Sequence, residues 1–227
     1  ESAMLCLICP TATAAAVVTR KLGGDVAGIT TYTVLINIVA AILVPLIVPL
    51  IQPMGGMDFW TAFNMIVARI FPLLIMPCLA AWLVRYLMPK VHRRLLEYPD
   101  LAFYLWAVAL TLAIAVTTKS IVRSEMPLGL LLMIALISLV CCILQFALGR
   151  YVGSRYRPRR AALKAEERGR QVRKVTAGQS LGQKNTVFAI WMGYTFMTPE
   201  TAIVGGLYSI WHNLYNSWQL RRTGNYD

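Results

Sequence analysis

The sequence predicts an all-α polytopic membrane protein. Of its 227 residues, 58% are apolar and only 14% are charged, an apolar share above that of ordinary soluble domains. Apolar runs long enough to span a membrane recur along the whole chain. The net charge of +12 comes from basic residues in the gaps between these runs. Because that charge is not gathered on one face of a soluble fold, we expect no nucleic acid partner.

Five apolar runs are predicted to span the membrane. A helix needs about 20 residues to cross the roughly 30 Å of hydrocarbon in a bilayer. The runs of this length are residues 27–51, 60–88, 101–119, 128–152 and 201–220.

Two further segments are apolar but interrupted, which predicts broken membrane helices. Residues 2–19 are interrupted by Cys9-Pro10-Thr11, and residues 175–197 by the polar run from Gly178 to Asn185. Free backbone groups at membrane depth are tolerated where they lie inside protein or line a wet cavity. Such cavities in transporters are usually binding sites. The alternative interpretation is a proline kink together with a polar loop at the membrane surface.

The loop charges predict the orientation of the chain. With seven spans, the loops on one side carry 18 Lys and Arg residues, and those on the other carry only Lys119 and Arg123. Basic residues accumulate on the cytoplasmic side, so we expect the carboxyl terminus to be cytoplasmic. Residues 155–174 are expected to form a basic helical arm there. The short outer loops favour a bacterial inner membrane protein.

Several chemistries lack the residues that they need. The cysteines lie in apolar runs, and the C-x-x-C spacing of Cys6 and Cys9 has no second pair, so we expect neither a metal nor a redox site. No G-x-x-x-x-G-K motif supports ATP-driven pumping. No span holds an Asp-Asp, Ser-Lys or His-Glu-x-x-His combination, so an intramembrane enzyme is not expected.

Three motifs resemble those of one transporter family. They are Cys9-Pro10-x-x-Thr13 leading to Gly24-Asp25-Val26-Ala27, then Gly182-Gln183-Lys184-Asn185, then Ser209-Ile210-Trp211-His212-Asn213. In this order and spacing they resemble the bile acid:sodium symporter family. The resemblance covers essentially the whole chain, which is similar to the fourth through tenth of the family's roughly ten helices. The first three are expected to be missing.

The resemblance implies an inverted-repeat transporter fold with two crossing discontinuous helices and seven transmembrane segments. A core moves against a panel of helices to give alternating access. The expected core is 1–57, 127–154 and 175–227, the panel is 58–126, and the basic arm is 155–174.

The resemblance also implies a site for a small organic anion beside the crossing. The family's substrate-binding positions match Thr13, Asn185, His212 and Asn213. Their hydroxyl, amide and imidazole groups suit a carboxylate or sulfonate, such as a bile acid or a pantoate-like hydroxy acid. The alternative is that these side chains only bond neighbouring helices.

The family's sodium-binding positions are poorly preserved. Oxygen ligands of the family are replaced by Ala15, Ala16, Ile29, Ser180 and Lys184, and Thr33 survives. Sodium needs several oxygen ligands and usually a carboxylate, and the methyl, sec-butyl and ammonium groups at these positions supply neither. We therefore expect a sodium-independent transporter without cofactors, in which Thr33, Ser180, Gln183 and Lys184 occupy the former ion region and Lys184 is the surrogate cation. Open alternatives are proton-coupled symport, uniport or exchange, an inert Lys184, and a non-transporting sensor or degenerate paralogue.

Overall fold

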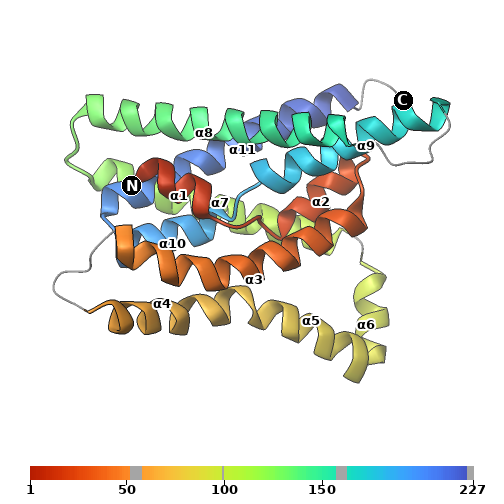
Figure 1. Cartoon of the computed structure of the whole chain (residues 1–227), viewed down its shortest axis with the longest axis horizontal. Coiled ribbons are helices and arrows are strands. Elements are labelled where there is room, and N and C mark those ends of the chain that lie inside the picture. Colours follow the sequence, from red (N-terminus) through yellow and green to blue (C-terminus); the bar gives the residue numbers. More distant parts are fainter. Residues whose placement is uncertain (52–57, 99, 157–162, 224–227) are drawn as a thin grey trace. The chain divides into compact units, whose positions relative to one another are not determined.

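The computed structural model describes residues 1–51, 58–98, 100–156 and 163–223, and these residues are almost entirely α-helical. The helices cluster in two compact units (Figure 1). Unit 1 comprises residues 1–33 and 106–227, and unit 2 comprises residues 34–105. The chain enters unit 2 within α3 (Val26–Ile51) and leaves it within α7 (Leu101–Arg123).

Unit 2 contains α4 (Phe59–Leu74), α5 (Met76–Leu87) and α6 (Pro89–Leu96). Helix α4 begins after Asp58, whose carboxylate accepts hydrogen bonds from the backbone amide of Thr61 at 3.0 Å and from its hydroxyl at 2.7 Å. This is the usual N-cap arrangement. Helix α5 begins close to Pro77, which has no amide hydrogen to continue α4. The single predicted span 60–88 is therefore two consecutive helices.

Unit 1 is built around two long helices, α8 (Leu128–Arg155) and α9 (Leu163–Gly182). They approach closely at two glycines of α8. A Cβ at Gly149 would overlap the carbonyl oxygen of Ala177, and a Cβ at Gly153 would overlap that of Arg173. Small residues at such positions let helix backbones come together in membranes.

The last two helices, α10 (Thr186–Phe196) and α11 (Pro199–Thr223), pack in the same way. A Cβ at Gly193 would overlap the backbone of Ala202, and one at Gly206 would overlap the side chain of Thr117 on α7. Close contacts of this kind fix the spacing of α7, α10 and α11 within unit 1.

The remaining helices of unit 1 are α1 (Ser2–Ile8) and α2 (Ala14–Lys21). Helix α2 ends at a turn in which Gly23 has a φ of +70°, a conformation that glycine adopts without strain. The next residues belong to the predicted Gly24-Asp25 motif. The amide of Asp25 donates to the hydroxyl of Thr176 at 2.8 Å, which ties this turn to α9.

Four stretches of described helix are long and apolar enough to cross a membrane: Val26–Ile51, Phe59–Leu87, Leu101–Arg123 and Leu128–Arg155. They confirm four of the five predicted spans. The fifth, α11, has 25 residues but is less apolar, because it carries His212, Asn213 and Asn216. The basic segment and the following broken helix also differ from expectation. Within the described residues, 163–174 are continuous with the first half of that broken helix as α9, while 157–162 lie outside the description.

Candidate functional site

Two chain breaks define the site. The first separates α1 from α2 and begins where Cys9 takes an extended conformation, with φ −60° and ψ 132°. Proline favours such a conformation in the residue before it, and Pro10 itself supplies no amide donor. The second break separates α9 from α10 and covers residues 183–185. It is shorter than the predicted interruption, since Gln179 and Ser180 remain helical.

The two breaks pair with each other. Thr11 and Lys184 form an isolated antiparallel β-bridge. The amide of Ala12 donates to the carbonyl of Gln183 at 2.9 Å, and the amide of Asn185 donates to that of Pro10 at 2.8 Å. In Figure 1 the extended segment between α1 and α2 lies beside the one between α9 and α10. Each break thereby satisfies backbone groups that the other leaves free, as buried backbone groups require.

Side chains reinforce this pairing of the two chain breaks, which we call the crossing. The hydroxyl of Thr11, only 1% exposed, donates to the carbonyl of Ser180 at 2.6 Å. The hydroxyl of Ser180 donates back into its own helix, to the carbonyl of Thr176 at 2.9 Å. Sequence reasoning counted Thr11 among the polar residues of the break but did not assign it a role. The position of the Thr11 hydroxyl, directly after Pro10 in the break, could have indicated a hydrogen bond there.

The ammonium of Lys184 lies at the end of α1. Its Nζ donates to the carbonyl of Leu7 at 3.3 Å, and the residue is 9% exposed. The last carbonyls of a helix carry partial negative charge and favour a cation. Within the described part of the chain, no carboxylate lies within ion-pair distance of this ammonium. An ammonium has three donors, so Lys184 retains capacity to bind an anion.

A chain of buried amides links the second break to the last helix. Gln179 donates through Nε2 to Oδ1 of Asn216 at 2.8 Å, and Asn216 donates through Nδ2 to Oε1 of Gln183 at 2.5 Å. All three side chains are at most 2% exposed. The amide groups Oε1 of Gln179 and Nε2 of Gln183 make no hydrogen bond. One acceptor and one donor beside the crossing are thus free to bond a ligand.

Tyr208 and Gln145 belong to the same region, and the sequence analysis did not identify either. The Tyr208 hydroxyl donates to the carbonyl of Gly182 at 2.9 Å. Gln145 donates through Nε2 to the Tyr208 hydroxyl at 3.2 Å and to the carbonyl of Cys6 at 3.3 Å. These bonds join α8 and α11 to the ends of the broken helices. Gln145 is the one amide side chain in the run 128–152. An isolated amide in an apolar span could have been predicted to bond a neighbouring helix.

The predicted anion contacts occupy different environments. His212 is 2% exposed, its ring lies 5.7 Å from the Tyr208 ring, and its Nδ1 makes no hydrogen bond. Asn213 donates to the carbonyl of Ser209 at 2.7 Å, and its Oδ1 makes none. Asn185 caps α10 by accepting from the amide of Phe188 at 3.1 Å. Thr13 is exposed at the start of α2, without a capping bond.

The structure therefore brings Lys184, Gln183, Ser180 and Asn185 together at the crossing. No hydrogen bond among the described residues joins Thr13, His212 or Asn213 to that group. The predicted ion residue Thr33 is buried in α3, where its hydroxyl donates to the carbonyl of Ile29 at 2.8 Å.

The donor set does not fit a sodium ion. Ala15 and Ile29, at two of the positions that supply oxygen in the resembling family, are both completely buried. A methyl and a sec-butyl group offer no ligand to a hard cation, and the Lys184 ammonium repels one. The disagreement lies in side-chain chemistry, because the pairing of the two breaks is intact.

Four stretches of described helix, long and apolar enough to cross a membrane, define the class as a polytopic α-helical membrane protein. The profile of the SBF-like CPA transporter family (DUF4137) matches residues 2–220. The chain belongs to this family and is an integral membrane transporter by that membership. This agrees with the predicted resemblance to bile acid:sodium symporters and points away from catalysis. No curated protein matches the chain.

Proposed function

We propose that this protein moves a small organic anion across the membrane by alternating access, with Lys184 taking the place of a coupling sodium ion. The observation that carries the proposal is the position of Lys184. Its ammonium is nine-tenths buried, lies at the crossing and has one carbonyl partner among the described residues. A buried cation without a counter-charge costs free energy, so an anionic solute is favoured beside it.

The surrounding polar groups support the same proposal. Two nitrogen atoms, His212 Nδ1 and Gln183 Nε2, are buried without a hydrogen-bond partner. Buried polar atoms normally find partners, and a bound carboxylate or sulfonate would supply acceptors to imidazole and amide donors. Thr13 and Asn185, at the starts of two half-helices, complete the proposed contacts. Their helix amino ends favour negative charge.

The side chains at the family's sodium-binding positions support a proposal about coupling. We propose that transport is independent of sodium, with Thr33, Ser180 and Gln183 occupying the former ion region. A proton gradient or exchange with a second anion would then supply the driving force. The cytoplasmic position of the carboxyl terminus is a prediction of the loop charges.

The test is uptake of radiolabelled anions by the full-length protein in proteoliposomes, beginning with pantoate and taurocholate. Uptake is measured with sodium, with potassium and across a pH gradient. We expect uptake that is equal in sodium and potassium and is lost in Lys184→Gln. Lys174→Gln on α9 is the matched control, because it removes an ammonium away from the crossing. Uptake that requires sodium, or that survives in Lys184→Gln, would overturn the surrogate role of Lys184.

A further inference from the structure

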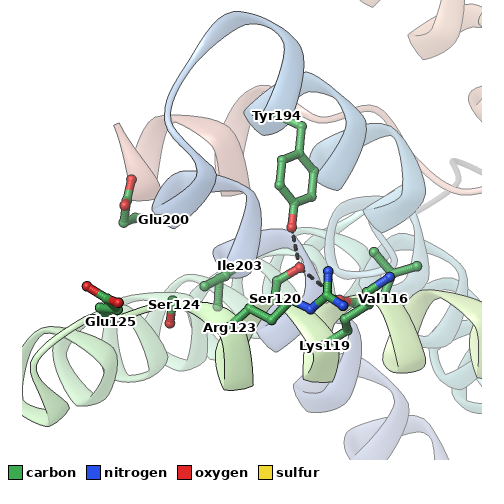
Figure 2. Close-up of a pocket in the computed structure, with 9 residues that line it drawn as sticks. All are labelled: Val116, Lys119, Ser120, Arg123, Ser124, Glu125, Tyr194, Glu200 and Ile203. Carbon is green, nitrogen blue, oxygen red and sulfur yellow. Dashed lines mark hydrogen bonds between the residues drawn. The ribbon is translucent and has the colours of Figure 1, made fainter.

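A cavity lies within unit 1, apart from the crossing. It is formed by the end of α7, by α10 and by the start of α11, and its volume is about 540 Å³ (Figure 2). This is a size typical of small-molecule sites. None of the residues of the crossing lines it. The loop charges predict that it opens on the outer side of the membrane, because Lys119 and Arg123 line it.

The cavity carries charges of both signs. Lys119 and Arg123 lie one turn apart on α7, so their side chains share one face of that helix. Glu125 follows the end of α7, and Glu200 lies in the first turn of α11. Figure 2 shows the two basic side chains gathered at one end of the cavity and the two acidic side chains at the other.

These charges do not neutralise each other. Within the described residues, no ion pair joins Lys119 or Arg123 to Glu125 or Glu200. The helix dipoles account for basic residues late in α7 and for an acidic residue early in α11. They do not account for the arrangement of all four groups around one cavity.

A hydroxyl pair lies beside the basic end. Ser120 on α7 forms a hydrogen bond with the hydroxyl of Tyr194 on α10, and it also bonds the carbonyl of Val116 at 2.8 Å. The cavity is thus bordered by a polar contact between two helices, and Tyr194 remains 45% exposed. These hydroxyls offer neutral hydrogen-bonding groups next to the cations.

We propose that this cavity binds a small zwitterion, a solute with one amino group and one carboxylate or sulfonate group. The acid group contacts Lys119 and Arg123, and the amino group contacts Glu125 and Glu200. A solute with only negative charge would be repelled by Glu125 and Glu200. A solute with only positive charge would be repelled by Lys119 and Arg123. This site is separate from the proposed anion site at the crossing. Its occupation by a zwitterion does not depend on whether the protein transports an anion.

The test is equilibrium binding to the purified full-length protein in detergent. Binding is measured by saturation-transfer NMR, which detects weak ligands and needs no transport. The probes are 3-aminopropanoate, 5-aminopentanoate and 8-aminooctanoate, with pentanoate and pentylamine as singly charged analogues. We expect one of the amino acids to bind at least about fivefold more tightly than either analogue, since exposed charge contacts each contribute modestly. Equal binding of pentanoate and 5-aminopentanoate would overturn the proposal if no other amino acid in the series bound more tightly.

Charge-neutralising variants test which end of the cavity binds the acid group and which binds the amino group. Arg123→Gln is expected to weaken binding of the amino acid and of pentanoate, and to leave pentylamine binding unchanged. Glu200→Gln is expected to weaken binding of the amino acid and of pentylamine only. Arg170→Gln and Glu167→Gln on the exposed face of α9 are the matched controls. Variants that elute as intact protein on size exclusion yet bind every probe as the wild type does would refute the assignment.

Discussion

Thr11 and Lys184 hold the two chain breaks together by pairing their backbones in an antiparallel bridge. The flanking amides of Ala12 and Asn185 complete this contact with bonds of 2.9 and 2.8 Å. The backbone of Lys184 is thus positioned by main-chain bonds, while its side chain reaches the end of α1. Substituting the Lys184 side chain therefore removes the charge without removing the backbone pairing. This separation makes the surrogate-cation proposal testable.

The first prediction concerns the Thr11 hydroxyl. Thr11→Val removes the 2.6 Å bond to the carbonyl of Ser180 at a site that is 1% exposed. We expect a loss of about 1–3 kcal/mol of stability, because a buried carbonyl loses its donor. The measurement is the melting temperature in detergent by size exclusion. Thr31→Val is the control, since its hydroxyl is exposed and bonds within its own helix. Equal melting temperatures for the two variants would contradict the prediction.

The second prediction concerns the amide chain. Asn216→Leu removes both bonds of Asn216, whereas Gln179→Leu removes one of them. We expect Asn216→Leu to cost more stability, because it leaves two buried partners unpaired. The double variant should cost less than the sum of the two single variants, by about 0.5–3 kcal/mol. Thermal unfolding of all four proteins forms the double-mutant cycle. Strict additivity would show that the three amides do not act together.

Local signals allowed the sequence to predict both breaks. Pro10 interrupts one apolar run and the polar residues around Gln183 interrupt the other, so each break could be placed without the fold. Their direct pairing depends on backbone bonds between distant segments, and residue types do not encode such bonds. The resemblance implied that the broken helices cross, but it did not identify the bond from Thr11.

Side-chain partners were less predictable than polar positions. The place of His212 in the last predicted span and the polarity of Asn185 follow from the pattern, yet the role of Asn185 as the cap of α10 depends on where that helix begins. Likewise, Gly149 could be recognised as a small residue in a span. That its neighbour is the carbonyl of Ala177 depends on how α8 and α9 pack.

The third prediction tests that packing. A Cβ at Gly149 would overlap the carbonyl oxygen of Ala177, while a Cβ at Gly129 of the same helix would meet no atom within 4 Å. We expect Gly149→Ala to lower stability by about 1–3 kcal/mol, because α8 and α9 must separate. Gly129→Ala should leave stability unchanged or raise it by up to about 1 kcal/mol, since alanine favours helix. Melting temperatures of the two variants in one detergent decide the matter.

The fourth prediction concerns pH and the start of α4. Hydrogen bonds from the hydroxyl and the amide of Thr61 lower the pKa of Asp58 below its usual range. A carboxylate with a lowered folded-state pKa contributes stability above its unfolded pKa and loses it as the pH falls through the folded value. We therefore expect the first turn of α4 to be protected from hydrogen exchange at pH 6 and to lose protection towards pH 2.

The measurement is hydrogen–deuterium exchange of residues 59–63, corrected for the intrinsic effect of pH on exchange. Asp58→Ala should show low protection at both pH values, because the cap is missing throughout. Thr61→Val keeps the backbone bond and removes the hydroxyl bond, so its transition should lie at a higher pH than that of the wild type. An Asp58→Ala variant with wild-type protection at pH 6 would show that the carboxylate does not hold this helix end.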